Sequence, residues 1–558
     1  MSGGLRFFLL VGLCLMGGEM GMAAATGPRF NEIQVMGTHN SYHIAPEPAM
    51  MQLIEQGGKG RSVSIDYTHR PLWEQFAVLG VRQIELDVYA DPKGGHYSEP
   101  SGRALVKAAN LGQLETHDPE GRLLKPGLKV FHVTDFDYRT TVYTFVDALK
   151  EIRDWSNQNP KHVPITVLVE VKEGAGRIGM TPAVRFDSSQ FDQIDREIRD
   201  VFPPKQLITP DSIRGGFDNL RTAVLQRGWP DLEQVRGKIL FALDNGAPVR
   251  DQYLEGHDSL RGRVLFVSVD ANHPAAAFMK INDPVADQEK IRQAVKAGFI
   301  VRTRADSPTR HARENDVRQR ELAFASGAQF VSTDYPEADV RFSTYDARLP
   351  NDLVARTNPV SGDQSGKAID YAGVTGWQSL SQKGGKDVWE NPFDWGEVDW
   401  VEGELHLRSD KNFMVASSKS YDDFVLELEA FVSSGNSGIF FRCRKGEKKL
   451  LGYQAEIDRS ERQYSGGIFD NTGRGFLMPK PKDHESLVGF RERQGEWVNR
   501  EGWNRYRVEC FGSRIRVAIN GRWVTDFVDE AHQEGVIGLQ HHGGDVVYRF
   551  RNIRIREL

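Results

Sequence analysis

The chain has few cysteines, no excess of either charge, and no long apolar run beyond its first residues. Three cysteines among 558 residues are too few for a disulfide framework or a cysteine-rich zinc cluster. Lysine and arginine number 71 against 77 acidic residues, a net charge of -6, which gives no support to a nucleic-acid partner. No later stretch approaches the roughly 20 apolar residues of a membrane helix, so at most peripheral membrane contact is expected. Cys443 and Cys510 are either bonded to each other or two small core residues.

Residues 1–25 have the composition of a cleavable secretory signal peptide. Arg6 supplies the positive start, Phe7–Met16 supplies an apolar run, and three alanines precede the expected cleavage between Ala25 and Thr26. The mature protein is therefore expected to be secreted or periplasmic. Lipidation at Cys14 is the alternative, but the preceding residue is larger than such a site uses.

Eight short apolar runs, each ending in polar residues, occur between residues 28 and 345. Several are followed by a helical pattern, as at 141–155, 189–201 and 308–326, which is typical of parallel strands linked by helices. Eight runs in this length favour a (β/α)₈ TIM-type barrel over an open flavodoxin-like sheet. The predicted strands begin at Ile33, Gln83, Lys129, Ile165, Lys238, Val264, Phe299 and Gln329.

A second domain of different texture follows. Residues 346–368 lose the periodicity and gain Pro, Gly, Ser and Asn, which predicts a linker. From 369 to 558, runs of alternating apolar and polar residues are separated by glycine turns, which predicts an all-β antiparallel sandwich. Seven of the ten tryptophans lie in this part, and burial in the sandwich core is favoured over a sugar-stacking surface.

Polar residues gather where the predicted barrel strands end. The first strand is followed by His39 and Asn40, the second carries Glu85 and Asp87, the third carries His132, and the fourth carries Glu170 with Lys172. The carboxyl ends of barrel strands meet at one mouth, so these side chains are expected to converge. Oxygen ligands from Asn40, Glu85, Asp87 and Glu170 suit Ca²⁺. For a single carboxylate, an ion pair at the surface is the alternative.

Two histidines from different strands can divide acid and base work, and basic residues nearby can hold a phosphodiester. His39 and His132 are the candidates for proton transfer, although a lone buried histidine is more often structural. Lys172, Arg302 and Arg304 are the candidates for substrate binding, with a structural ion pair equally expected for each arginine. The insertion at 91–126 is expected to lie over the same mouth and shape access to it.

The motifs MGTHNSY, ELDVY, FHVTD and VLVEVK together resemble the calcium-dependent phosphoinositide-specific phospholipase C family over residues 28–345. The resemblance implies that His39 is the general base acting on the inositol 2-hydroxyl and that His132 is the acid acting on the diacylglycerol oxygen. It also implies Ca²⁺ as cofactor, an inositol phospholipid as substrate, and an inositol cyclic phosphate as product.

The sequence also departs from the better-known members of that family. Those carry paired lysines after the fifth strand, where this chain has Asp244 and Asn245, so highly phosphorylated inositides are not the expected substrates. Glycerophosphodiester phosphodiesterases share the barrel, a histidine pair and an ending similar to STDYP. A glycerol-linked diester is therefore the alternative substrate.

The second domain resembles the 3-keto-disaccharide hydrolase family, which has a concanavalin-like jelly-roll fold, through pieces such as GNSGIFFR, YQAEIDRS, INGRWVTDF and IGLQHHGG. Gln454, Glu456 and Asp458 alternate along one predicted strand and face one side, and His541 ends another. They form a candidate carbohydrate site, for binding or for glycoside cleavage, with the solvated face of a strand as the alternative. Sugar chemistry in this domain as the main activity is the competing hypothesis.

Overall fold

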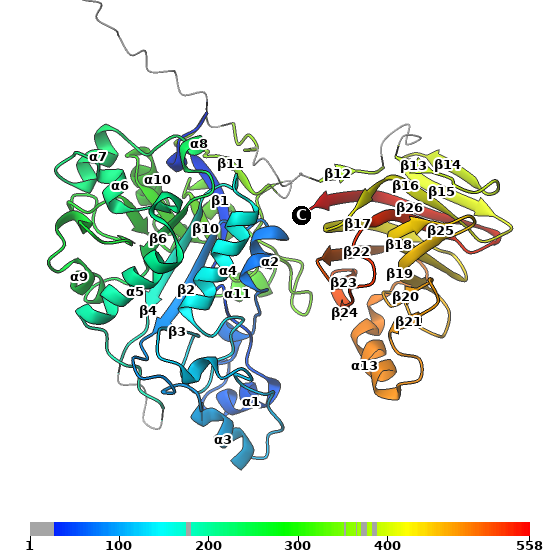
Figure 1. Cartoon of the computed structure of the whole chain (residues 1–558), viewed down its shortest axis with the longest axis horizontal. Coiled ribbons are helices and arrows are strands. Elements are labelled where there is room, and N and C mark those ends of the chain that lie inside the picture. Colours follow the sequence, from blue (N-terminus) through cyan, green and yellow to red (C-terminus); the bar gives the residue numbers. More distant parts are fainter. Residues whose placement is uncertain (1–26, 175–179, 351–352, 364, 370–376, 382–387) are drawn as a thin grey trace, which may run out of the picture.

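The computed structural model describes residues 27–174, 180–350, 353–363, 365–369, 377–381 and 388–558. The predicted signal peptide, with Cys14 and the Ala25/Thr26 cleavage position, lies outside the described residues. Two bodies lie side by side, a helix-covered barrel and a β-sandwich (Figure 1). The structure confirms the predicted TIM-type barrel followed by an all-β sandwich.

Eight parallel strands close the barrel within the described part of the chain. They are β1 (Ile33–Thr38), β2 (Gln83–Tyr89), β4 (Ile165–Val171), β6 (Ile239–Leu243), β7 (Phe266–Val267), β8 (Phe278–Lys280), β9 (Ile300–Arg304) and β10 (Phe330–Thr333). Each pairs with the next, β10 returns to β1, and a parallel bridge between Ser268 and Phe278 joins β7 to β8. Outside this ring, β5 (Leu207–Ile208) extends β6, and β11 (Ala355–Thr357), within the predicted linker, pairs with β1.

One predicted barrel strand was wrong, and one real strand was missed. The run from Lys129 forms only β3 (Lys129–Val130), which pairs antiparallel with the end of β2, so His132 follows a short side strand. The missed strand is β8. Its residues, Phe278, Met279 and Lys280, include no β-branched residue and follow three alanines, so the segment lacks the composition that marks a strand.

Most of the helices alternate with the strands and cover the outside of the barrel, whereas α1 (Pro48–Gln56) and α3 (Ser101–Ala108) lie together below the strands in Figure 1. The others are α2 (Leu72–Ala77), α4 (Phe145–Gln158), α5 (Ser188–Val201), α6 (Pro210–Arg214), α7 (Leu220–Gln226), α8 (Leu232–Val235), α9 (Val249–Leu254), α10 (Gln288–Lys296), α11 (Arg310–Arg313) and α12 (Arg318–Ala325). The pattern at 308–326 gives two helices, because Asn315 has φ +56° between them. Among the described helices, none has the length and apolar character needed to cross a bilayer.

Strand β2 shows how the sequence positions the site. Ile84, Leu86 and Val88 are buried in the apolar core between strands and helices. The alternate residues Glu85 and Asp87 are equally buried and face the barrel interior, where Glu85 meets Arg302 of β9. The period of two along a strand thus separates an apolar outer face from a polar inner one.

The second body is a sandwich of two antiparallel sheets. One holds β12 (Gln378–Ser379), β14 (Glu397–Val401), β15 (Glu404–Ser409), β17 (Phe424–Phe431), β22 (Asn504–Phe511), β23 (Arg514–Ile519), β24 (Arg522–Val528) and β26 (Gly544–Glu557). The other holds β13 (Trp389–Glu390), β16 (Phe413–Tyr421), β18 (Asn436–Lys445), β19 (Leu450–Asp458), β20 (Ile468–Asp470), β21 (Gly475–Met478) and β25 (Gly535–His541). Helix α13 (His484–Gln494) follows β21. Cys443 and Cys510 are buried as free thiols, the second of the two predicted alternatives.

Candidate active site

A cluster of carboxylates lies where β2, β4 and β6 end. Glu85, Glu170 and Asp244 each offer an oxygen, and these atoms lie within 4.8 Å of one another. Asp87 is the register partner of Glu170 on the neighbouring strand. Asn40 follows β1 with φ +44°, a left-handed conformation that asparagine tolerates better than most residues. Among the described residues, none donates a hydrogen bond to its buried Oδ1.

Three basic side chains balance these acids. Lys172 Nζ lies 2.9 Å from Asp87 and 2.7 Å from Glu170. Lys280 Nζ lies 2.7 Å from Asp244. Arg302 donates to the second oxygen of Glu85 at 2.5 Å. The acidic residues of β2 and β4 and the one that follows β6 therefore each have a basic partner.

The cluster has the properties of a site for a hard cation. Burial raises the pKa of Glu85 to about 8, against the opposing charge of Arg302, and burial raises the pKa of Asp87 to about 7, against Lys172. Glu85 Oε1 and Asp244 Oδ1 are buried oxygens that accept no hydrogen bond from any residue that the structure describes. Because the donors are carboxylate and amide oxygens without sulfur, the residues fit Ca²⁺.

His39 is oriented by the aspartate that directly follows the last barrel strand, β10. Its Nδ1 lies 2.8 Å from Asp334 Oδ1, and since a carboxylate only accepts, Nδ1 carries the proton. Arg304 donates to the other oxygen of Asp334 at 2.8 Å. His39 Nε2 then carries a lone pair that can accept a proton, and it lies 3.5 Å from Glu85 Oε1. Burial and then the charge of Arg304 lower the pKa of His39 to about 3, so the ring is neutral at physiological pH.

His132, the second candidate for proton transfer, is also oriented by a buried aspartate, Asp137. Its Nδ1 donates to Asp137 Oδ2 at 2.6 Å. The other oxygen of Asp137 lies 2.8 Å from Nε2 of the buried His43, whose Nδ1 faces the Tyr67 carbonyl. Although burial opposes ionisation, the two histidines hold the pKa of Asp137 well below its usual range. Because Nδ1 of His132 is used in the hydrogen bond to Asp137, its Nε2 is the ring atom that can exchange a proton with a substrate.

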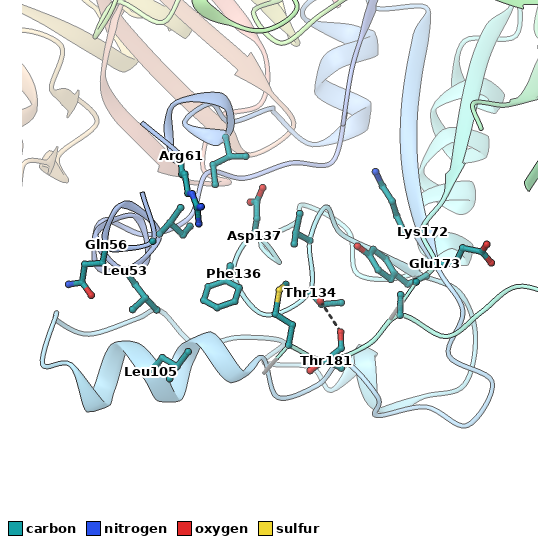
Figure 2. Close-up of a pocket in the computed structure, with 18 residues that line it drawn as sticks. Leu53, Gln56, Arg61, Leu105, Thr134, Phe136, Asp137, Lys172, Glu173 and Thr181 are labelled. Atoms are coloured by element: carbon teal, nitrogen blue, oxygen red, sulfur yellow. Dashed lines mark hydrogen bonds between the residues drawn. The ribbon is translucent and has the colours of Figure 1, made fainter. Parts of the chain in front are cut away.

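An apolar pocket opens beside this second pair. It has a volume of about 1040 Å³ and is bordered by Asp137 and Lys172. Leu53 of α1, Leu105 of α3 and Phe136 lie on one side of it and Lys172 on the other, with Asp137 between them (Figure 2). Helix α3 belongs to the insertion at 91–126, which therefore contributes a wall of the pocket.

The structure brings most of the predicted barrel residues together, and it adds three aspartates that sequence reasoning missed. The sequence marks Asp244 only as a replacement for family lysines, and it gives Asp137 and Asp334 no role. A usable signal existed, since Asp334 directly follows the last strand and Asp137 lies five residues after His132. Arg302 and Arg304, predicted to bind substrate, are buried in ion pairs with carboxylates of the site, which is the predicted structural alternative.

In the sandwich, two of the four predicted residues serve local structure. Both ring nitrogens of the buried His541 are bonded to backbone groups. Asp458 accepts from Ser460 and Arg462 in the turn that follows its strand. Gln454 and Glu456 do lie together, with Gln454 Nε2 3.3 Å from Glu456 Oε1, and they form what remains of the candidate site.

The substitution Glu456→Gln is expected to reduce the loss of stability that the protein suffers as the pH rises. Burial raises the pKa of Glu456 from 4.5 to about 7, so the folded state binds more protons than the unfolded state between these values. Stability therefore falls as the pH rises through this window, by at most about 1.4 kcal/mol for each pH unit. Thermal melts at pH 4.5 and 8 measure it. An equal drop in Tm for both proteins would contradict the prediction.

These features define a class of protein, the (β/α)₈ barrels with an oxygen-rich cluster and two oriented histidines at the carboxyl ends of the strands. A family profile described as phosphoinositide phospholipase C, Ca²⁺-dependent, matches residues 29–359, more than half of the chain. The chain belongs to that family. Residues 368–556 match a second profile, the 3-keto-alpha-glucoside-1,2-lyase-like domain.

Several solved structures are similar to parts of the chain. The calcium-dependent phosphoinositol-specific phospholipase C of a Pseudomonas species has 17% identity and a TM-score of 0.35, over 60% of this chain and 96% of that one. The Ca²⁺-dependent enzyme of Streptomyces antibioticus has 16% identity and a TM-score of 0.34, over 55% and 95%. A carbohydrate-binding module of Bacillus subtilis has 22% identity and a TM-score of 0.23, over 30% and 92%. A search of curated proteins found no match.

Proposed function

We propose that the protein is an exported Ca²⁺-dependent phosphodiesterase that cleaves phosphatidylinositol-type diesters by phospholipase C chemistry. The observation that carries the proposal is the pair of histidines, His39 and His132, each oriented by a buried aspartate beside a cluster of oxygen ligands. Family membership supports it. Export rests on the composition of residues 1–25 alone.

His39 is the general base in this proposal. With its Nδ1 proton held by Asp334, its Nε2 accepts the proton of the inositol 2-hydroxyl. The 2-oxygen then attacks phosphorus and forms a new P–O bond, which closes the cyclic phosphate. Arg304 keeps Asp334 ionised and in place, and this fixes the tautomer of His39 that can act as a base.

His132 is the general acid. The P–O bond to the lipid breaks as the new one forms, and the leaving alkoxide takes the Nε2 proton of His132. Asp137 stabilises the imidazolium before that transfer and orients the ring through its short hydrogen bond. Neither step needs an oxidant, and the proton count balances, because one histidine gains the proton that the other loses.

Asn40, Glu85, Asp87, Glu170 and Asp244 would hold the calcium ion. When bound, Ca²⁺ polarises the phosphoryl oxygen and offsets its growing negative charge. Lys172 neutralises two of these acids in the structure and lies at the edge of the apolar pocket. It is placed to contact the diester from the side of the leaving group.

The apolar pocket favours a lipid leaving group over glycerol. It borders Asp137, the partner of the proposed acid, and its walls include Leu53, Leu105 and Phe136. Leu105 of the insertion, which lines the pocket, is 46% exposed. Exposed apolar side chains around a pocket mark contact with an apolar ligand or a membrane surface. A glycerol-linked diester has no acyl chain that could contact these apolar side chains.

Hydrolysis of phosphatidylinositol and of glycerophosphoinositol by the purified protein, with Ca²⁺ and with chelator, tests the proposal. Calcium-dependent release of an inositol cyclic phosphate from the lipid is the expected result. Cleavage of the glycerol compound alone would favour the glycerophosphodiesterase alternative. No cleavage of either compound would contradict the proposal as a whole.

The substitution Leu105→Asp is expected to lower cleavage of phosphatidylinositol about tenfold and to leave glycerophosphoinositol cleavage within about twofold. A charged side chain in this wall disfavours binding of an acyl chain. Glycerophosphoinositol has no acyl chain, so its binding is not affected. The matched control is Leu225→Asp, since Leu225 is similarly exposed, at 42%, on helix α7. Equal losses on both substrates would show that the wall does not contact the lipid.

For the sandwich we propose carbohydrate binding, supported by its family match and by the adjacent Gln454 and Glu456. Calorimetry with disaccharides and the Glu456→Gln variant tests it. Loss of binding in the variant is expected, because a buried carboxyl and amide together present both a donor and acceptors to sugar hydroxyls. Turnover of a glycoside would extend the proposal to catalysis.

A further inference from the structure

We propose that the sandwich is a working part of the barrel's catalytic site, because it holds the segment that positions the His39 loop. That segment is residues 68–75, the turn before α2 and most of α2 itself. It contacts the His39 loop (residues 38–43) on one side and strands β22–β24 on the other, and α2 lies on the side of the barrel that faces the sandwich (Figure 1). The proposal rests on the proposed function for its kinetic readout only.

On the barrel side, the 68–75 segment bonds directly to the backbone of the His39 loop. His69 Nε2 donates to the His39 carbonyl oxygen at 2.9 Å, and the His69 N–H donates to the His43 carbonyl at 2.9 Å. Gln75 Nε2 donates to the Ser41 carbonyl at 2.6 Å. Both donor side chains are buried. The position of the loop backbone therefore depends on where this segment sits.

On the sandwich side, buried ion pairs hold the same segment. Arg70 donates to Glu509 of β22 at 2.7 Å, and both side chains are only 5% exposed. Glu74 accepts from Arg514 and Arg516 of β23, the latter at 3.4 Å. Arg70 also donates to Glu337 of the barrel at 2.6 Å, so this buried arginine joins the two bodies, and the contacts together favour one placement of the segment.

Ring contacts add to the same interface. Trp73 stacks on Phe511 of β22, with ring centroids 4.1 Å apart. The Arg70 guanidinium lies over Trp523 of β24 at 5.1 Å. Phe511 also packs against the apolar core of the barrel. Charge, stacking and apolar contact thus all join β22–β24 to the turn that carries His69.

These contacts form a continuous path from the sandwich to the reacting groups. Glu509 holds Arg70 together with Glu337 of the barrel, the neighbouring His69 donates to the His39 carbonyl, and Asn40 is next in the chain. A displacement of about 1 Å at a reacting group costs up to about a hundredfold in rate. Residues Glu509 and Phe511 are therefore positioning residues for a site that they do not touch.

The test uses the full-length mature protein with Glu509→Gln and, separately, Phe511→Ala. Each is expected to lower kcat for phosphatidylinositol about tenfold, to leave KM within about twofold, and to speed amide hydrogen exchange in residues 38–43 and 68–75. Phe511→Tyr, which keeps the stacked ring, should restore both. Asp470→Asn is the matched control, since Asp470 is a buried, arginine-paired carboxylate on the other sheet.

Two results would overturn the proposal. One is unchanged exchange in residues 38–43 in both variants, and the other is an equal effect of the Asp470→Asn control. Circular dichroism verifies that each variant is folded, and the Phe511→Ala and Phe511→Tyr pair keeps the comparison meaningful if Glu509→Gln is unstable. If the wild-type protein cleaves no diester, the proposed function fails, but hydrogen exchange still decides the question of coupling.

Discussion

Replacing His39 with alanine is expected to lower kcat for calcium-dependent phosphatidylinositol cleavage by about 10³-fold. The variant lacks the only ring nitrogen that Asp334 and Arg304 hold ready as a base in the proposed mechanism. A fluorogenic or radiolabelled inositol lipid measures the loss. Binding of sugars by the sandwich should be unchanged, because none of its candidate residues touches His39 in the described structure.

The control is His257→Ala, since His257 is a half-buried histidine whose ring bonds only to the local Arg261 carbonyl among the contacts described. It should cleave the lipid at the wild-type rate. If a well-folded His39→Ala protein lost a glycoside activity together with lipid cleavage, the division of labour between barrel and sandwich would be incorrect. Retention of full lipid cleavage would remove His39 from the mechanism.

The substitution Asp244→Asn is expected to raise the Kd for Ca²⁺ at least about tenfold, equivalent to about 1.4 kcal/mol. The change keeps the shape and one oxygen but removes a charge from the cluster with Glu85 and Glu170. The concentration of Ca²⁺ that gives half-maximal activity should rise in parallel. Calorimetry on the protein alone gives the first value, and titration of activity gives the second.

Asp270→Asn is a suitable control, because Asp270 is an exposed aspartate in the loop that follows β7. It should bind Ca²⁺ like the wild type. An unchanged Kd in Asp244→Asn would exclude Asp244 from the ligand set and return that set to the four residues expected from sequence. A lowered kcat with an unchanged Kd would instead assign Asp244 to the placement of Lys280.

The sequence predicted which way the acidic side chains of β2 face, because that geometry is local. Alternation along β2 places Glu85 and Asp87 on one face, and both are buried inside the barrel. The pairing of Lys172 with Glu170, two residues apart on the same side, also follows from alternation. Such relations need only the strand type and its end point, and long apolar runs such as ITVLVEV indicate both.

The short strands could not be predicted correctly, because a periodic pattern needs more residues than they contain. The barrel strand β8 is three residues long and β3 is two, too short to show a period. The apolar character of KVFHVT predicted a barrel strand, yet after β3 the chain turns, and Val133 bonds with Asp137 across that turn. This turn is what brings Asp137 under His132.

The sequence by itself determined the two domains, the alternation that aims the carboxylates inward, and the motif that carries His39. Tertiary structure alone decided the partners of the reacting groups: Asp334 meets His39 across 295 positions, and Glu509 meets Arg70 across 439. Periodicity reports which face of an element is buried, because that depends on near neighbours. Which distant element covers that face depends on how whole surfaces fit, and no local pattern encodes it.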